Sequence, residues 1–338
     1  MNNPSVSVLM SAYNAEKYVG EAIESILNQT FKDYEFIIID DASTDKTLSQ
    51  IKNYTDNRIV IIQNEKNLKL AASLNKGLRI AKGKYIARMD ADDISDLTRL
   101  EKQFDFLERY PEIDICGTAM QLFGNEKGTR YYRRKDKEIK AGMIWAGTIS
   151  HGTVLMRHDK IIKHKLFYDE TFHVGQDWKY WYDAKDQVVF SNLLEPLYFC
   201  RRGQQNITVK HGGSRSIERY ATMHKAMLGD MKISFTEQEL GLHQFIIGQF
   251  KLAPSPGVIK DAKKWLNKLI NHNRSIKAYD VMAFDEISKY YWSDLFYKLI
   301  PFGFRNVFTY FMVTGISPQQ MIYYIKQMLR KPQKIQNN

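Results

Sequence analysis

The sequence predicts an α/β fold in its N-terminal part and a helical extension in its C-terminal part. Two observations lead to this prediction. Up to residue 90, short β-branched runs alternate with amphipathic stretches, which is the order of a parallel sheet with helices on both faces. Beyond residue 214, apolar residues recur at helical spacing. With 338 residues, 44% of them apolar, the chain can build one large or two ordinary cores.

Runs of β-branched and aromatic side chains predict four strands before residue 90, at residues 6–10, 36–39, 59–62 and 85–87. Apolar residues with a period of 3.6 predict helices over 18–27, with Asn14 as the N-cap, and over 70–81. Each helix is long enough to cross back over the sheet, so we expect the strands to run parallel.

The rest of the chain is expected to complete this domain and then to change character. Candidate strands at 113–116 and 153–156 and a helix at 176–184 precede a Gly-rich, polar segment at 203–214. We therefore expect one domain over residues 1–212 and a helical region over residues 213–338. In that region, residues 258–270 predict a basic amphipathic helix, and Gly315 and Pro318 interrupt an uncharged stretch that would otherwise suggest a membrane span.

The charge of the chain predicts a polyanionic partner. Its 49 Lys and Arg exceed its 38 Asp and Glu by 11, and residues 257–338 alone carry a net charge of +8. A nucleic acid, an anionic lipid surface or a phosphorylated substrate would match this excess. Because no recognition helix, zinc finger or RNP motif accompanies it, we do not expect a nucleic acid.

Two further features suggest a cytoplasmic protein. Cys116 and Cys200 are the only cysteines and form no metal-binding or disulfide pattern, which is typical of a reducing compartment. The N-terminal residues lack the basic patch and apolar run of a signal peptide.

Polar side chains follow three of the predicted strands at the point where each strand ends. These residues are Ser11, Tyr13, Asp40, Asp41, Asp90 and Asp92. In an open α/β sheet, ligands bind beyond the carboxyl ends of the strands. No GxGxxG follows the first strand and no GxxxxGK[ST] occurs, so neither a dinucleotide fold nor a P-loop is indicated.

Asp90 and Asp92 stand at alternate positions after a strand and could share one hard cation. Their oxygen ligands suit Mg²⁺ or Mn²⁺, which fill the rest of their coordination shell with water and substrate phosphates. Two carboxylates alone are a weak signal, and the alternative is a solvated surface turn.

Five segments, in the same order and spacing, resemble family 2 glycosyltransferases: residues 6–14, 25–30, 39–45, 75–77 and 83–93. The resemblance covers residues 4–205. It implies a GT-A fold with a Rossmann-like sheet and an inverting transfer that depends on Mn²⁺ or Mg²⁺. The implied donor is a nucleotide diphosphate sugar, with a UDP-sugar favoured. The implied acceptor is a glycan or a lipid-linked sugar, as in bacterial surface polysaccharide or glycolipid assembly.

The resemblance also implies roles for the strand-end residues. Tyr13 falls where the family stacks a ring on the nucleotide base, although an ordinary half-buried tyrosine is the alternative. Ser11 and Asp41 fall where the family binds the base or ribose. Asp90 matches a ribose or metal-shell carboxylate, and Asp92 matches the ligand of the metal that holds the diphosphate.

By the same resemblance, Asp177 is the catalytic base that deprotonates the acceptor hydroxyl. It follows Gln176, where the family usually has Glu, so one negative charge beside the base is absent. The alternative is that Asp177 is only a first-turn acid that stabilises its helix.

Weaker candidates surround these residues. Arg201, Arg202 and Lys210 could clamp the diphosphate or be solvated surface charges. His151 could lie near the substrates or be a structural histidine. Lys69 replaces a residue that is commonly glycine in the family, so either the local turn differs or its ammonium serves the donor.

Three alternatives concern the whole protein. The QxxRW motif of processive relatives is absent, which favours addition of a single sugar. The basic C-terminal region could lie on the inner face of the plasma membrane, or its helices could pack on each other or on a second copy of the chain. The rival functions are a sugar nucleotidyltransferase, which would need a Gly-rich basic loop after the first strand, and a non-catalytic binding module.

Overall fold

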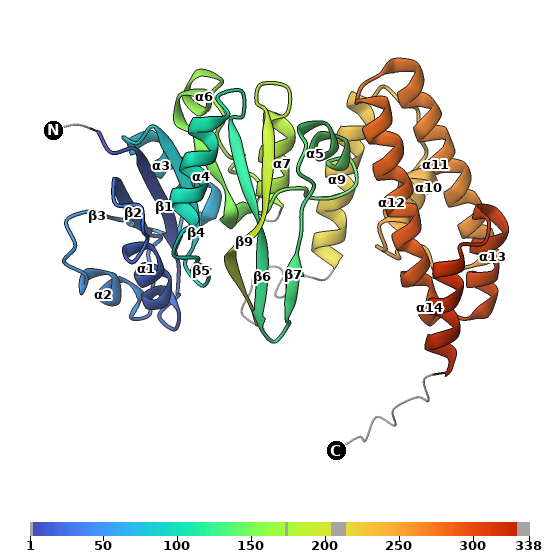
Figure 1. Ribbon diagram of the computed structural model, residues 1–338, viewed down its shortest axis with the longest axis horizontal. Helices are drawn as coiled ribbons and strands as arrows, with labels where there is room; N and C mark the ends of the chain where they lie inside the picture. The colour runs from blue at the N-terminus through green and yellow to red at the C-terminus, as the bar shows by residue number, and fades with distance from the viewer. Residues whose placement is uncertain (1–2, 173–174, 204–213, 330–338) are drawn as a thin grey trace. The chain divides into compact units, whose positions relative to one another are not determined.

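A computed structural model describes residues 3–172, 175–203 and 214–329 of the chain (Figure 1). The chain divides into two compact units, Met1–Tyr220 and Ala221–Asn338. The predicted boundary between residues 212 and 213 lies outside the described residues.

In the described part of the first unit, nine strands form one mixed sheet. Its order is β3-β2-β1-β4-β8-β6-β9-β5, with β7 paired to β6. The strands are β1 (Val6–Ala12), β2 (Tyr34–Asp40), β3 (Ile59–Gln63), β4 (Tyr85–Asp90), β5 (Ile94–Ser95), β6 (Ile115–Gly124), β7 (Gly128–Arg130), β8 (Leu155–Arg157) and β9 (Phe190–Arg202). The first four strands are parallel, as predicted, whereas β8 runs antiparallel to both β4 and β6.

Helices lie against this sheet and between its strands. They are α1 (Val19–Leu27), α2 (Thr47–Lys52), α3 (Lys69–Ile80), α4 (Arg99–Arg109), α5 (Asp136–Gly142), α6 (His158–Lys163) and α7 (Gln176–Ala184), with a 3-10 turn, η1, at His151–Thr153. The α/β prediction is therefore confirmed, and so is the helix expected at 176–184. The strand expected at residues 153–156 is shifted, because Thr153 belongs to the turn η1 and β8 starts only at Leu155.

Alternate residues of β1 face opposite layers, which places helices on both faces of the sheet. Val6, Val8 and Met10 belong to the same core cluster as the apolar face of α1. Leu9 points the other way, toward α3, where a Cβ on Gly77 would lie 2.1 Å from Leu9 Cδ1. Glycine at this position lets α3 approach β1 closely.

The N-cap predicted at Asn14 is wrong. Helix α1 begins only at Val19, and its N-cap residue, Tyr18, makes no side-chain cap hydrogen bond. Asn14 instead has a positive φ of 50° and accepts a hydrogen bond from the Thr44 N–H at 2.8 Å. Its side chain therefore ties the loop after β1 to the loop after β2.

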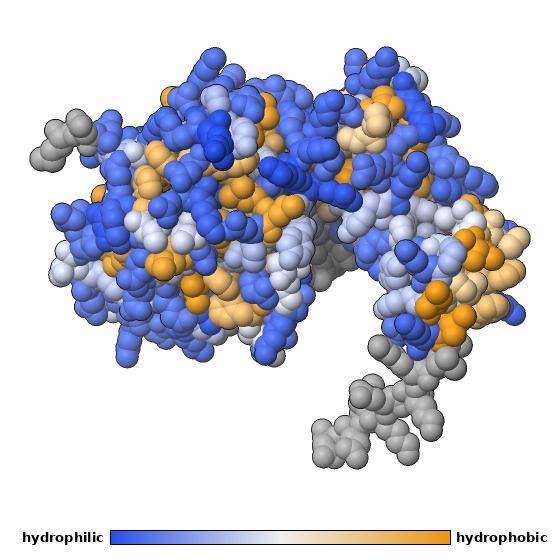
Figure 2. Space-filling view, in the orientation of Figure 1, coloured by the Kyte–Doolittle hydropathy of each residue, from blue (hydrophilic) through white to orange (hydrophobic). Residues whose placement is uncertain are grey.

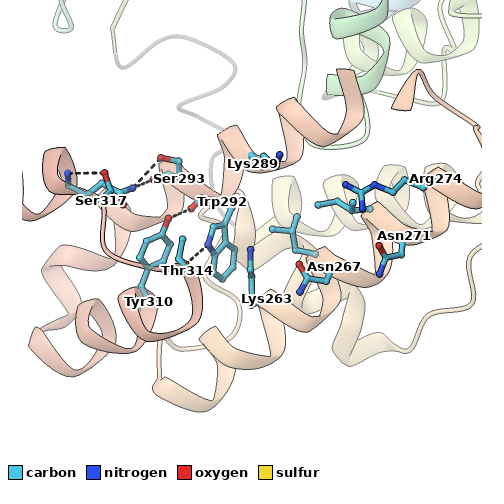
Figure 3. A pocket seen from close by; sticks show the side chains of 13 residues that line it. Lys263, Asn267, Asn271, Arg274, Lys289, Trp292, Ser293, Tyr310, Thr314 and Ser317 are labelled. Atoms are coloured by element: carbon cyan, nitrogen blue, oxygen red, sulfur yellow. Dashed lines mark hydrogen bonds between the residues drawn. The ribbon is translucent and has the colours of Figure 1, made fainter. Parts of the chain in front are cut away.

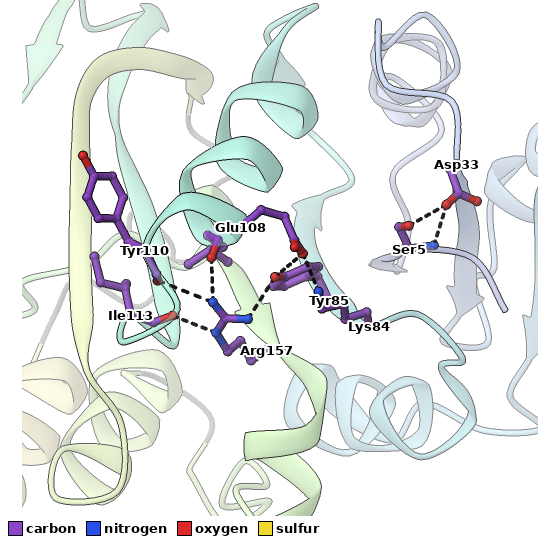
Figure 4. Close-up of polar contacts among 9 residues, drawn as sticks. Ser5, Asp33, Lys84, Tyr85, Glu108, Tyr110, Ile113 and Arg157 are labelled. Carbon is purple, nitrogen blue, oxygen red and sulfur yellow. Dashed lines mark hydrogen bonds and ion pairs between the residues drawn. The ribbon is translucent and has the colours of Figure 1, made fainter.

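Arg157 on β8 anchors the C-terminal end of α4 to β4 (Figure 4). Its guanidinium donates to the carbonyl oxygens of Leu107 and Ile113, at 2.6 and 2.9 Å, and to the Tyr85 hydroxyl at 2.9 Å. Tyr85 in turn donates to Glu108 at 2.7 Å. This network satisfies carbonyl groups at a helix end that would otherwise lack partners.

The second unit is helical, as predicted. It contains the end of α9 (Ser214–Asp230), then α10 (Glu237–Ile246), α11 (Pro256–Ile276), α12 (Val281–Leu299), the 3-10 turn η2 (Ile300–Phe302), α13 (Phe304–Thr314) and α14 (Pro318–Leu329). Gly315, with φ of 92°, ends α13 and separates it from α14. Among the described helices, none is both long and apolar enough to cross a membrane.

Candidate active site

The register of the parallel strands brings the predicted strand-end residues together. Ser11 lies opposite Ile39 on one side and Asp90 on the other, and Ala12 lies opposite Asp40. The Tyr13 side chain follows directly and is 49% exposed, so its ring is available at this edge. Three strands therefore deliver polar groups to one rim of the sheet.

Asp41 holds the start of α3 against this rim. Its carboxylate is only 2% exposed and accepts hydrogen bonds from the backbone N–H groups of Leu68 and Lys69, at 2.8 and 2.9 Å. The Asn64 amide donates to it as well, at 2.8 Å. Neighbouring Asp40 is fully buried and accepts a hydrogen bond from the Ser43 N–H at 3.3 Å. These hydrogen bonds hold the C-terminal end of β2 in place.

The turn at Lys69 is the one that glycine favours. Lys69 has a φ of 72°, in the left-handed region, although it carries a side chain. Ala42, which follows Asp41 in the sequence, also has a positive φ, of 58°. The hydrogen bond from the Lys69 N–H to Asp41 helps to hold this strained backbone. The local turn therefore keeps the glycine geometry, and the Lys69 side chain is exposed.

The motif at residues 75–77 makes contacts beside Asp41 and its partner Asn64. Asn75 clamps the segment around Tyr168, because its side chain bonds both the N–H and the carbonyl oxygen of Tyr168, at 2.8 and 2.9 Å. Lys76 donates to the Asn64 side-chain oxygen at 2.8 Å and so orients the amide that binds Asp41. Each residue of this motif has a structural contact.

The loop after β4 is held from two strands. Arg88 shares a face of β4 with Asp90 and forms an ion pair with it at 2.5 Å. From β9, the Tyr198 hydroxyl accepts from the Asp90 N–H at 3.1 Å, and the Arg201 N–H donates to Asp93 at 2.7 Å. Arg201 also donates from Nε to the Asp92 carbonyl oxygen at 2.9 Å.

Burial and the charge of Asp90 raise the pKa of the two carboxyl groups that follow Asp90 in this loop, Asp92 and Asp93. Burial, followed by the charge of Asp90, raises the pKa of Asp92 to about 6. Burial and the charges of Asp90 and Asp92 raise the pKa of Asp93 well above its usual value. A divalent cation beside Asp92 would relieve this repulsion, so the residues fit a metal. Among the described residues, no three His, Cys, Asp or Glu side chains form a ready metal cage.

Two arginines beneath the loop offset part of its negative charge. Arg88 is 1% exposed and Arg99, on α4, is fully buried. Arg99 donates to the carbonyl oxygen of Arg88 at 2.8 Å and lies beneath the Tyr198 ring, 5.2 Å from its centroid. Burial lowers the pKa of Arg99 to about 10, and Arg99 remains a cation at neutral pH.

Asp177 lies in the first turn of α7, and the charge of Asp90, at the end of β4, affects its pKa. Gly175 precedes the helix with a φ of 73°, and Trp178 anchors it by donating to the Met143 carbonyl oxygen at 2.8 Å. Burial raises the pKa of Asp177, and the charge of Asp90 raises it further, whereas nearby backbone N–H groups and Arg88 lower it. Its carboxylate is therefore a stronger base than an exposed aspartate.

His151 belongs to an aromatic cluster that includes residues of α7. Its Nε2 lies 2.8 Å from the Tyr168 hydroxyl, and the Tyr168 ring stacks on Tyr180 of α7. Burial and the charge of Arg88 lower the pKa of His151 well below its usual value, so the ring is neutral. Gly152 follows, and a Cβ there would lie 2.3 Å from the Tyr198 hydroxyl and 2.8 Å from Asp90 Oδ2.

The arginines at the end of β9 are engaged within the protein. Arg201 stacks over the rings of Tyr18 and Phe123, at 4.2 and 4.5 Å, and pairs with Glu21 at 2.8 Å. Arg202 lies 3.6 Å from Glu126. Lys210 lies outside the described residues.

The sequence reasoning missed Arg88, Tyr198, Tyr168 and Gly152. Only Arg88 carried a usable signal, since a charged residue inside a buried strand needs a partner. The contacts of Tyr198 join positions 108 residues apart and leave no mark in the local pattern.

Comparisons with known proteins agree with this architecture. The model of the family described as "Glycosyl transferase family 2" matches residues 7–185 of the chain. An uncharacterized glycosyltransferase of Haemophilus influenzae is 36% identical over 222 residues, which cover 62% of this chain and 69% of the relative. The glucosyltransferase WfaP of Escherichia coli is 32% identical over 189 residues, covering 56% of this chain and 70% of WfaP.

Among solved structures, residues 1–349 of S. aureus TarS in complex with UDP-GlcNAc superimpose with a TM-score of 0.61. The match covers 86% of this chain and 91% of the TarS chain at 18% identity, and it shows a shared fold. The family match goes further, because residues 7–185 include the strand-end segments on which the site is built. The chain therefore belongs to glycosyl transferase family 2 and is a glycosyltransferase.

Proposed function

We propose that this glycosyltransferase moves a single sugar from a UDP-sugar to a hydroxyl of a lipid-linked or glycan acceptor, with inversion at the anomeric carbon. One observation supports this most directly: Asp177 and the Asp90–Asp92 pair belong to one electrostatic neighbourhood, since the charge of Asp90 raises the pKa of both Asp92 and Asp177. A base and an acidic metal site near each other suit in-line displacement.

The nucleoside end of the donor would lie along the ends of β1 and β2. The exposed Tyr13 ring offers a stacking surface for the base. Ser11, beside Asp90 in the register, offers a hydroxyl for the ribose or the base. Asp41 is the acceptor for a ring N–H, as uracil presents, and the amides that it already binds fix its orientation.

Asp92, with Asp90 in the outer shell, would hold Mn²⁺ or Mg²⁺. Magnesium usually takes only one or two protein carboxylates together with substrate phosphates, which suits this sparse arrangement. When bound, such an ion supplies Lewis-acid stabilisation of the departing diphosphate. Arg88 keeps one Asp90 oxygen engaged, which leaves Asp92 as the principal ligand. The solved mannosyltransferase PcManGT of Pyrobaculum calidifontis, with a TM-score of 0.52, is a complex with GDP-Man and Mn²⁺.

Asp177 would take the proton of the acceptor hydroxyl. A single carboxylate on the acceptor side, opposite the diphosphate, permits direct displacement without a covalent intermediate, and inversion follows. Arg201 would assist from β9 by holding the Asp92 backbone in place. Arg202, which lies 3.6 Å from Glu126, would add positive charge at the same end of β9.

The names of relatives support the substrate class. WfaP is named a UDP-Glc:alpha-D-GlcNAc-diphosphoundecaprenol beta-1,3-glucosyltransferase, and WbnJ of Escherichia coli an O-antigen biosynthesis glycosyltransferase. We therefore place this chain in surface polysaccharide assembly, with a lipid-linked diphosphate sugar as acceptor.

A lipid-linked acceptor calls for contact with a membrane, and the second unit offers a surface for it. Phe304, Phe308 and Met312 form an exposed stripe at four-residue spacing on α13, and Ile322 and Ile325 are exposed on α14. Figure 2 shows hydrophobic side chains gathered over these helices. Together with the basic charge of this region, the stripe supports peripheral binding at the inner face of the plasma membrane, rather than burial against a second copy of the chain.

Thermal shift measurements with UDP, GDP, CDP and dTDP, each with and without Mn²⁺, test the donor site. We expect UDP with Mn²⁺ to stabilise the protein, by about 2.7 kcal/mol at a hundredfold excess over its Kd, and the other nucleotides to do less. A matched measurement on Asp92→Asn should lose the effect of Mn²⁺. Equal stabilisation of wild type by UDP with and without Mn²⁺ would contradict a metal-dependent donor site.

A further inference from the structure

A groove opens in the second unit, and its lining includes no residue assigned a role above. Its volume is about 630 Å³, within the range of small-molecule sites. Figure 3 shows Lys263, Asn267, Asn271 and Arg274 along one face of α11, opposite Lys289 and Trp292 of α12. The residues from α11 recur every three or four positions, so they present one continuous wall. We call this site the α11–α12 groove.

The lining of this groove is cationic and contains no carboxylate. Lys263, Lys289 and Arg274 line it, and the other lining side chains are apolar, amide, hydroxyl or aromatic. Asp285, outside the lining, pairs with Arg274. Within the described part of the chain, neither Lys263 nor Lys289 lies in an ion pair.

Lys263 contacts the wall of the groove and is affected by the charge of a second lysine, Lys289. Its ammonium lies 4.9 Å from the centroid of the Trp292 ring, which forms part of the groove wall. Burial, and then the charge of Lys289, lower the pKa of Lys263. Two cations that repel each other in a partly desolvated groove are stabilised by an anion between them.

The neutral polar side chains of the groove favour an anion that also accepts hydrogen bonds. The amides of Asn267 and Asn271 and the hydroxyl of Ser293 are neutral hydrogen-bonding groups beside the cations. Ser293 is oriented by the Gln320 amide, which donates to its hydroxyl at 3.1 Å. Phosphate, with several acceptor oxygens and a negative charge, uses ammonium and amide donors together.

We propose that the α11–α12 groove binds a phosphate ester or phosphate anhydride through Lys263 and Lys289. Two ligands carry this chemistry: the diphosphate of a lipid-linked sugar acceptor and the headgroup of an anionic phospholipid. Only this choice of ligands rests on the proposed function, since phosphate binding itself needs no transfer activity.

Calorimetric titration of the full chain with inorganic pyrophosphate tests the site. EDTA is present throughout, so that Asp92 holds no metal that could bind the ligand. We expect Lys263→Gln/Lys289→Gln to weaken pyrophosphate binding at least about tenfold, because each lysine contributes a charge-assisted hydrogen bond. Lys260→Gln is the matched control: it removes the same charge from an exposed position of α11 outside the groove lining and should leave the affinity unchanged.

Two results would overturn the site: no pyrophosphate binding by wild type, or equal weakening by Lys260→Gln, which would indicate diffuse attraction. Lys263→Arg/Lys289→Arg should retain binding, which separates loss of charge from misfolding. The shift caused by UDP with Mn²⁺ should persist in the glutamine variant, so a failed donor site and a failed groove are distinguishable.

Vesicle sedimentation separates the two phosphate sources. If the groove takes a phospholipid headgroup, the glutamine variant should lose binding to phosphatidylglycerol vesicles, and pyrophosphate should release wild type from them. If it takes the acceptor diphosphate, the glutamine variant should lose pyrophosphate binding but still sediment with the vesicles.

Discussion

Replacing Asp177 by Asn removes a base while preserving the size of the side chain and its place in the first turn of α7. A positioned general base contributes about 10²–10⁴ in rate, so kcat should fall by that factor. The loss corresponds to roughly 3–5 kcal/mol of transition-state stabilisation. Nucleotide binding should not change, because the proposed role of Asp177 is toward the acceptor hydroxyl and not toward the nucleotide.

Stability distinguishes the catalytic interpretation of Asp177 from the structural one. Since burial raises the pKa of this carboxylate, its charged form is unfavourable in the folded state. Asp177→Asn should therefore raise the melting temperature at neutral pH. A first-turn acid that merely stabilises its helix predicts the opposite, a loss of about 0.3–1 kcal/mol.

The pH dependence follows from the same shift. A carboxyl group whose pKa is raised by folding favours the folded state at low pH and loses this contribution as pH rises through the folded pKa. The stability advantage of Asp177→Asn should thus grow with pH. Wild-type kcat should fall about tenfold for each pH unit below the pKa of Asp177, because the base becomes protonated.

The assay is single-turnover transfer from UDP-sugar, with melting curves recorded at several pH values. Asp183→Asn is the matched control, because Asp183 lies on the same helix, is more exposed and pairs with Lys179. Retention of wild-type kcat by Asp177→Asn, or loss of activity in Asp183→Asn as well, would refute the assignment of Asp177 as the base.

Three further substitutions test other parts of the first unit. Asp92→Asn should abolish the dependence of UDP binding on Mn²⁺ while leaving the fold intact by circular dichroism, and unchanged dependence would place the metal elsewhere. Gly77→Ala should cost about 1–3 kcal/mol in chemical denaturation, since its Cβ would lie 2.1 Å from Leu9 Cδ1, and the cost should shrink in a Leu9→Val background. Lys69→Gly should stabilise the protein by about 1 kcal/mol by relieving the left-handed backbone at φ 72°, and a lower unfolding midpoint would show that Lys69 makes a compensating contact.

The sequence predicted those parts of the fold whose pattern is local. The strands up to residue 90 are mostly apolar runs, and helix α7 was predicted with its observed bounds. Strand β9 was not predicted, because Leu194, Glu195 and Pro196 interrupt its pattern. Its register against β6 shifts in this region, so the irregularity is built into the sheet.

For the candidate site too, the sequence predicted the features that follow from local pattern and missed the long-range contacts. The ends of parallel strands must meet at one edge, which is why Ser11, Asp41 and Asp90 could be grouped from the sequence. The groups that hold them could not, since Tyr198 and Arg201 reach the loop from β9, more than a hundred positions away. The roles assigned to Asp92 and Asp177 remain predictions that the substitutions above address.

The attachment of the Asp90–Asp93 loop to β9 has a consequence for ligand affinity. Tyr198 and Arg201 bond the backbone of Asp90 and Asp92 and the side chain of Asp93, which makes the loop part of the folded sheet. The conformational entropy of this loop is therefore lost during folding and not when a ligand arrives. A metal or donor that binds as proposed would meet carboxylates that are already in place. Loosening β9 should therefore weaken binding through entropy even where no contact to the ligand is removed.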